Sequence, residues 1–168
     1  MAIYLVTPFL PGALSSMELD DTASILASAD FFEICDAEQQ RLLAFASERR
    51  HYRAGQVLFE HGSVSDGAYI IHRGTISAAE NPDHPERNYK VSGPGAVVGE
   101  MSLLLNRSRY ATVSAITDID VLFVPRQAFV KLMHQYPDMA ARAAARIEQK
   151  LGSYLGSLDR FRSKPPSS

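Results

Sequence analysis

The stretch GEMSLLLNRSRYATV, residues 99–113, constrains the fold and chemistry of this chain more than any other part of it. It opens on Gly99-Glu100 and reaches Arg109 just before a strand-like Ala-Thr-Val. Glycine lets the backbone approach a ligand closely, and a short helical turn after it directs N–H groups at an anion. Arginine adds a planar fork that suits phosphate better than lysine does. The stretch predicts a pocket for one phosphate, with a carboxylate nearby to accept from a hydroxyl group.

The composition is that of an ordinary globular domain. The chain has 168 residues, of which 46% are hydrophobic and 21% charged, so one domain with a sizeable core is expected. The net charge of −2 provides no general basic field for nucleic acid, so an anion site must be local. The single cysteine excludes a disulfide within the chain and a metal site built on several cysteines. We expect Cys35 to be a small buried hydrophobic residue.

The N-terminal residues 1–14 are apolar, but they carry no basic residue and are broken by two prolines and a glycine. A secretory signal has a basic first segment, so an arm that docks on its own or another subunit is the favoured interpretation. No run reaches the roughly 20 apolar residues of a membrane helix. We therefore expect a cytoplasmic protein without a membrane partner.

Two helices are predicted before residue 50. The first covers roughly residues 17–29. The second begins at Asp36, which suits an N-cap, and is expected to end in the charged cluster 48–50. Its expected apolar face consists of Leu42, Leu43, Phe45 and Ala46.

From residue 51 the pattern changes to short β-favouring runs separated by glycines. These runs are residues 57–59, 69–71, 75–76, 89–91, 110–116 and 119–124. Many short strands with turns between them predict a small barrel or jelly roll. The polar, proline-containing segment 81–88 is expected to be an exposed hairpin loop.

The chain returns to helical patterns after Pro125. A short hinge helix is expected up to Tyr136, and Pro137 suits the first position of a long helix. Apolar residues then recur at heptad spacing, at Ala140, Ala144, Ile147, Leu151, Tyr154, Leu158 and Phe161. The stripe predicts either a parallel coiled coil between two subunits or packing against the chain's own β-roll. Residues 164–168 are expected to be disordered.

This order of elements resembles the cyclic nucleotide-binding domain family, which includes regulatory subunits of cAMP-dependent kinase, catabolite activators and cyclic nucleotide-gated channels. The resemblance runs from about residue 29 to residue 162. Besides residues 99–113, the motifs in family order are Phe31-Phe32, residues 55–62, residues 66–74 and Gly93-Pro94-Gly95. Several motifs in order with compatible spacing indicate the fold more strongly than any one of them.

The resemblance assigns roles to single residues. It implies that Glu100 accepts from the ribose 2′-hydroxyl group and that Arg109 pairs with an equatorial phosphate oxygen. Gly99, Met101 and Ser102 would contribute backbone atoms. From the residues alone, an ion pair between Glu100 and Arg109 that braces the turn remains an alternative.

Tyr110 departs from the family pattern, which often has Ala, Ser or Thr directly after the arginine. Its ring could extend away from the site, stack on or hydrogen-bond the base, or narrow the pocket. Because the small threonine that favours guanine is absent, the resemblance favours cAMP over cGMP.

The functional prediction is a stand-alone cyclic nucleotide sensor that is not an enzyme and needs no cofactor or metal. Its ligand would be cAMP (or cGMP), and movement of the C-terminal helices would signal to an unidentified regulatory protein. The alternative is a degenerate domain kept as a dimerisation or interaction module without ligand. A DNA-binding activator is disfavoured, because no helix-turn-helix follows the long helix and the net charge is negative.

The expected fold class is α+β: a jelly-roll-like β-roll with an N-terminal helical segment, a C-terminal hinge helix and a long helix. The expected parts are an arm at 1–28, the β-roll with its flanking helices at 29–136, a heptad helix at 137–162 and a tail at 163–168. A homodimer through residues 140–161 is expected.

Overall fold

The computed structural model describes the backbone of residues 16–162 and the side chains of residues 17–152. Two four-stranded antiparallel sheets form the β-roll, in the orders β1-β8-β3-β6 and β2-β7-β4-β5. The strands are β1 Glu48–Tyr52, β2 Val57–Phe59, β3 Gly67–Arg73, β4 Thr75–Ala79, β5 Tyr89–Ser92, β6 Ala96–Val98, β7 Thr112–Ala115 and β8 Ile119–Pro125. The predicted α+β class and β-roll are confirmed.

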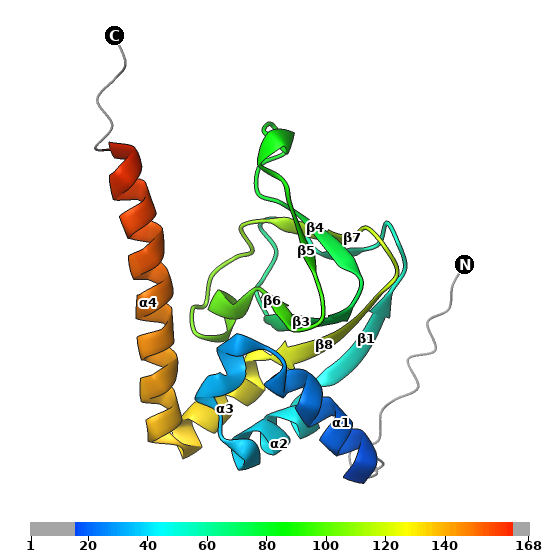
Figure 1. Ribbon diagram of the computed structural model, residues 1–168, viewed down its shortest axis with the longest axis vertical. Coiled ribbons are helices and arrows are strands. Elements are labelled where there is room, and N and C mark those ends of the chain that lie inside the picture. The colour runs from blue at the N-terminus through cyan, green and yellow to red at the C-terminus, as the bar shows by residue number, and fades with distance from the viewer. Residues whose placement is uncertain (1–15, 163–168) are drawn as a thin grey trace.

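The helices gather at one end and one side of the roll (Figure 1). They are α1 Ser16–Ala27, α2 Ala37–Ala46, α3 Arg126–Gln135 and α4 Pro137–Arg162, with the 3₁₀ turns η1 Asp30–Ile34, η2 Pro85–Arg87 and η3 Glu100–Leu103. Helices α1, α2 and α3 lie under the roll, and α4 runs up one side of it, roughly parallel to the projecting β4–β5 hairpin (Figure 1).

Two hydrophobic clusters follow from the alternation of side chains along β3 and β8, since successive residues of a strand point to opposite faces. Ile70 and Leu122 pack against the helices together with Phe32 and Phe129. Ile71 and its neighbours on the other face fill the interior of the roll; that cluster consists of Tyr69, Ile71, Ile76, Ala78, Val98, Val113, Ala115, Ile119, Val121 and Phe123. The sheet containing β3 and β8 therefore packs against the helices with one face and lines the interior of the roll with the other.

Helix α2 begins as predicted but ends earlier. The Asp36 carboxylate accepts from the Gln39 N–H, and the Gln39 side chain accepts from the Asp36 N–H, which is a capping box. The prediction that residues 48–50 end this helix is wrong, because they open β1, which pairs antiparallel with β8. β1 lies at the edge of its sheet, where charged side chains are tolerated and discourage pairing with other chains.

The predicted apolar face of α2 is only partly correct. Leu42 and Phe45 are 45% and 47% exposed, whereas Leu43 and Ala44 are buried together with Gln39. Gln39 and Leu43 are four residues apart and share one face of the helix, and α2 packs against α1, α3 and β8.

Strand β6 was not predicted, and the strand expected over 110–116 is shorter. β6 pairs with β3, and its three residues are too few to show a pattern of alternation. β7 begins only at Thr112. The N–H of Arg109 donates to the Ser63 carbonyl and its carbonyl accepts from the Gly62 N–H, so this part of the chain is held outside the regular sheet.

Helix α4 begins at Pro137 as predicted, but its buried face is not the predicted heptad stripe throughout. Met139, Ala143 and Ile147 are buried in the cluster shared with the other helices. Ala144, a member of the predicted stripe, is exposed. The first part of α4 thus packs on its own chain, because η1 and α3 lie against that face.

Some predictions concern residues that lie outside the described ones: the arm 1–14, the tail 164–168 and the side chains of Tyr154, Leu158 and Phe161. Within the described part of the chain, no helix is long and apolar enough to cross a membrane.

Candidate ligand-binding site

A cavity of about 400 Å³ opens between the strands of the second sheet and the segment from Gly99 to Ala111. It brings together every residue predicted from the sequence for the site: Gly99, Glu100, Met101, Ser102, Arg109 and Tyr110. Val91 of β5 and Val113 of β7 supply apolar walls. A mostly apolar cavity with a few convergent polar groups is the usual form of a small-molecule site.

Gly99 makes the close turn that leads into η3. Its φ of +79° is a left-handed conformation that favours glycine, and a Cβ at this position would collide with Nη1 of Arg109. The expected short helical turn follows it as η3, which ends at Leu103. Leu103 is fully buried in the cluster that packs against the helices, so it anchors the turn.

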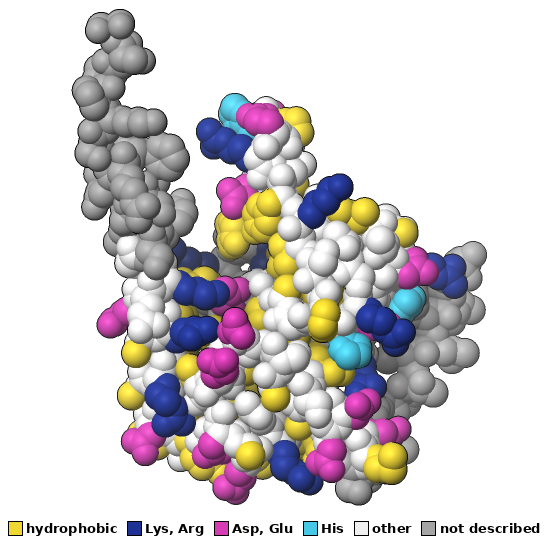
Figure 2. All heavy atoms as spheres, viewed as in Figure 1, with side chains coloured by type: hydrophobic (Ala, Val, Ile, Leu, Met, Phe, Trp, Pro, Cys, Tyr) yellow, Lys and Arg dark blue, Asp and Glu magenta, His cyan; other side chains and the backbone are white. Residues whose placement is uncertain are grey.

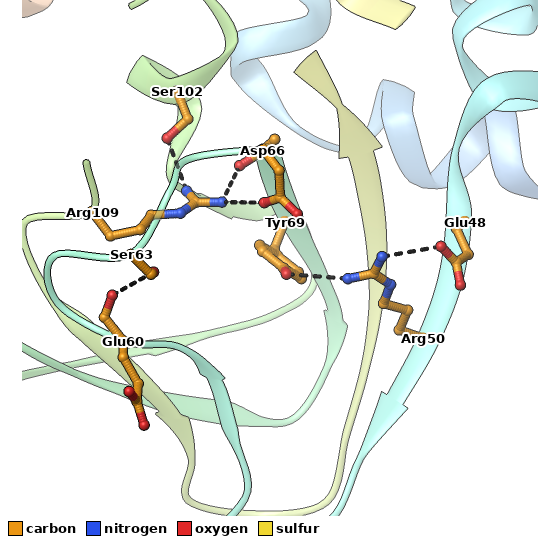
Figure 3. A network of polar contacts seen from close by, with 9 residues as sticks. Glu48, Arg50, Glu60, Ser63, Asp66, Tyr69, Ser102 and Arg109 are labelled. Atoms are coloured by element: carbon orange, nitrogen blue, oxygen red, sulfur yellow. Dashed lines mark hydrogen bonds and ion pairs between the residues drawn. The ribbon is translucent and has the colours of Figure 1, made fainter. Parts of the chain in front are cut away.

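Arg109 is the buried cation of the site, with 4% of its surface exposed. Nη1 donates to the Ser102 hydroxyl at 2.8 Å, and Nη2 donates to the Gly67 carbonyl at 2.6 Å and to Asp66 Oδ1 at 3.1 Å. These contacts fix the plane of the guanidinium. Figure 3 shows how Asp66 and Ser102 approach it from different elements.

Two aromatic rings make cation–π contacts with the same guanidinium. The Arg109 guanidinium carbon lies 4.1 Å from the centroid of Phe59 and 5.9 Å from that of Tyr69. Tyr69 is also 5.9 Å from the guanidinium carbon of Arg50, whose Nη1 donates to the Tyr69 hydroxyl at 3.2 Å. Glu48 accepts from Arg50 in turn, so the network of Figure 3 runs across the roll from the edge strand to the cavity.

One polar atom of Arg109 has no acceptor in the part of the chain that the structure describes. Among the described residues, Nε is buried and lacks a hydrogen-bond partner. Burial also lowers the pKa of Arg109, against the raising effect of Tyr69 and Asp66. A buried donor left without an acceptor destabilises a protein by about 1–3 kcal/mol, so an anion in the cavity that accepts from this guanidinium would relieve the deficit.

Glu100 does not pair with Arg109. Its Oε1 accepts from Nζ of Lys150, which belongs to α4, while Arg109 pairs with Asp66. The ion pair between Glu100 and Arg109 that the spacing left open is therefore absent. Instead, the two residues line one cavity as separate groups, a cation and a carboxylate.

Tyr110 lines the same cavity as the buried Arg109 but is itself 59% exposed. Tyr89 of β5 also lines the cavity and is 39% exposed. Burial, followed by a side-chain hydrogen bond with Tyr110, raises the pKa of Tyr89. Figure 2 shows exposed hydrophobic side chains at the base of the β4–β5 hairpin, on the side that faces α4. The tyrosine pair thus gives the cavity an aromatic rim.

The sequence did not identify four residues that complete the site: Phe59, Asp66, Tyr69 and Lys150. The first three lie inside motifs that indicated the fold, but a motif of that kind does not show that their side chains meet Arg109. Lys150 is 50 positions from Glu100, and no local pattern connects the two. Among the described residues, no three His, Cys, Asp or Glu side chains gather as a metal site would require.

The comparison with protein families agrees with this geometry. The family profile described as "Cyclic nucleotide-binding domain" matches residues 49–136, more than half of the chain. The chain belongs to the cyclic nucleotide-binding domain family. The match contains the buried arginine, the glutamate of η3 and both tyrosines of the rim.

Solved structures of family members are similar as well. A cyclic nucleotide-binding-like protein from Brucella abortus is 37% identical, with a TM-score of 0.57 over 68% of this chain and 99% of that one. The N-terminal domain of a transcriptional regulator from Streptomyces coelicolor is 26% identical, with a TM-score of 0.64 over 78% of this chain and 94% of that one.

Curated relatives contain this region within longer proteins. Lysophospholipase NTE1 of Chaetomium globosum is 31% identical over 112 residues, which are 66% of this chain but 7% of that protein. The HTH-type transcriptional regulator Cmr of Mycobacterium tuberculosis is 29% identical over 111 residues, 66% of this chain and 46% of the regulator. The chain thus spans less than half the length of these relatives.

Proposed function

We propose that this protein is a receptor for a cyclic nucleotide. The observation that carries the proposal is Arg109, a buried cation in a cavity whose Nε lacks an acceptor among the described residues. A cation held at 4% exposure, in a cavity that the Glu100 carboxylate also lines, suits an anionic ligand that also carries hydroxyl groups. A cyclic nucleotide combines one negative charge, a ribose hydroxyl and an aromatic base.

Each part of such a ligand has a counterpart in the cavity. The cyclic phosphate would accept from Arg109, whose orientation Ser102 and Asp66 fix. The ribose 2′-hydroxyl would donate to Glu100. The base would extend toward the rim, where the rings of Tyr89 and Tyr110 offer faces for stacking. The proposal places cAMP ahead of cGMP because position 110 is a tyrosine and not a small threonine.

Ligand binding would be transmitted to a partner through the C-terminal helices. Helix α3 contacts η3, and α4 contacts α3, so the turn that holds the phosphate touches the first helix of this chain of contacts directly. Lys150 adds a link from α4 to Glu100. We propose a self-contained sensor module in which the β-roll and its flanking helices occupy residues 29–136. Helix α4 would also pair two subunits through its later turns. A regulatory protein would bind the module and respond to the signal. We propose no enzymatic activity for this chain.

Calorimetric titration of nucleotide-free protein with cAMP and then cGMP tests the receptor. Wild type should bind, and Arg109→Ala should lower the affinity at least tenfold, because a charge-assisted hydrogen bond contributes about 1.5–3 kcal/mol. Arg107→Ala is the matched control: it also removes an arginine that lines the cavity, but an exposed one, and a loss of less than about threefold is expected.

The competing function is an interaction module without ligand. The observation that favours it is the exposed Tyr110, which departs from the residue types common at this position of the family. No heat and no thermal shift with either nucleotide, in protein shown by mass spectrometry to carry no bound nucleotide, would favour the module.

A further inference from the structure

The carboxylate assigned to the ribose already has a cationic partner. Oε1 of Glu100, in η3, accepts from Nζ of Lys150, in α4. The Glu100 side chain is only 17% exposed, whereas that of Lys150 is 44% exposed. The pair therefore joins a mostly buried site residue to a side chain that can withdraw into water.

This pair links α4 to the β-roll beyond the part of the helix that is buried. Among the side chains of α4 that the structure describes, Ile147 is the last one in the buried cluster. The described side chains that follow it, from Glu148 to Gly152, are exposed, and Leu151 is 45% exposed. Among the described residues, the ion pair with Glu100 is the one salt bridge that α4 makes to the β-roll.

We propose that Lys150 is a specificity-determining residue that competes with the ligand's hydroxyl group for Glu100. A ligand with a ribose 2′-hydroxyl group displaces the ammonium group from Glu100 and thereby frees this turn of α4. A ligand without the hydroxyl group binds through its phosphate and base and leaves the pair intact. This inference rests on the proposed cyclic nucleotide receptor and adds the means by which the ribose would be sensed.

The competition has a measurable consequence for selectivity. In wild type, the hydrogen bond that the 2′-hydroxyl group gains at Glu100 is offset by the ion pair that it breaks. The preference for cAMP over 2′-deoxy-cAMP is therefore small. Without Lys150, Glu100 is free to accept, and the preference grows. Any general attraction between Lys150 and the phosphate affects both nucleotides equally, so it cancels in the ratio of their affinities.

The experiment is calorimetric titration of the full chain with cAMP and 2′-deoxy-cAMP. The variants are wild type, Lys150→Ala, Lys150→Arg and, as a matched control, Lys131→Ala, which removes an exposed lysine from α3. Lys150→Ala should raise the ratio of the two affinities about two- to fivefold, the range expected for losing a partly exposed ion pair. Lys150→Arg and Lys131→Ala should keep the wild-type ratio.

If Lys150→Ala binds both nucleotides with the same affinity ratio as wild type, the proposed competition is wrong. The proposed receptor function would not be affected by that result. A ratio that rises equally in Lys131→Ala would also overturn it, because the effect would then be one of net charge. Absence of binding by every variant, each with a wild-type circular dichroism melt, would overturn the receptor and the competition together.

Discussion

The guanidinium carbon of Arg109 lies 4.1 Å from the centroid of the Phe59 ring, a cation–π contact inside the cavity. Such a contact is worth about 0.5–2 kcal/mol. The Phe59 ring restricts the orientation of the guanidinium plane, whereas the hydrogen bonds to Ser102, Asp66 and Gly67 fix the position of the group within that plane. Phe59 is thus a positioning residue for the proposed phosphate site.

Phe59→Leu tests this role, since leucine keeps the apolar character but has no ring. We expect the affinity for cAMP to fall roughly three- to tenfold, in line with the loss of one cation–π contact. Phe45→Leu makes the same change on α2, at a residue that is 47% exposed, and should leave binding unchanged. Equal affinities for the two variants in titration calorimetry would argue against the positioning role.

Gly99 and Gly55 offer a matched pair for the turn. Both have left-handed φ values, +79° and +89°, so alanine should destabilise the protein by about 1–2 kcal/mol at either site through backbone strain. A Cβ at Gly99 would also collide with Nη1 of Arg109, whereas at Gly55 it would meet no atom within 4 Å. We expect thermal melts to show a decrease for both variants, and binding to be lost only for Gly99→Ala. Retained binding in Gly99→Ala would contradict the proposed place of the phosphate.

Tyr110 should contribute its ring and not its hydroxyl group. If the base stacks on the rim, Tyr110→Phe should bind cAMP nearly as well as wild type, and Tyr110→Ala should lose about 1 kcal/mol or more of binding free energy. Titration of both variants with cAMP and cGMP measures this. Loss of binding in Tyr110→Phe would show instead that the hydroxyl group, which bonds Tyr89, is the functional part.

The sequence predicted the helices and strands that are determined by residues close to them in the chain. The Asp36 cap, the start of α4 at Pro137 and six of the strands were predicted because each depends on residues close to it in the chain. β1 and β6 were missed because an edge strand of charged residues and a strand of three residues owe their structure to the partners β8 and β3.

The binding site also has one part that nearby residues determine and another part that distant residues complete. Residues 99–110 contain the cavity-lining cation, carboxylate and turn, and they form a continuous segment that a sequence pattern can reveal. Asp66 and Lys150 reach this segment from β-roll and helix positions 43 and 50 residues away from their partners. Such contacts arise only when the chain is folded, so the partners of Arg109 and Glu100 could not be read from spacing.

Cys35 should make the protein less stable at alkaline pH. Cys35 is 5% exposed, and burial raises the pKa of its thiol to about 12, whereas the pKa of cysteine in an unfolded chain is about 8.5. Above that pH the unfolded chain loses this proton first, so the free energy of unfolding falls as the pH rises toward the folded pKa. Urea titrations between about pH 8.5 and 11 should give a shallower decline for Cys35→Ala than for wild type. Parallel declines would mean that the thiol ionises as readily in the folded protein.

The proposed dimer through residues 140–161 would use the part of α4 that does not pack on its own chain. Within the described part of the heptad stripe, Ile147 is buried against its own chain, whereas Ala144 and Leu151 are exposed, Leu151 at 45%. Leu151→Asp should convert a dimer to a monomer in light scattering at tens of micromolar, approximately the range in which weak interfaces are populated. Gln149→Asp introduces a charge on the exposed side of the same helix and should leave the mass unchanged. A wild-type monomer at that concentration would exclude the dimer and leave the Lys150 contact as the role of this helix.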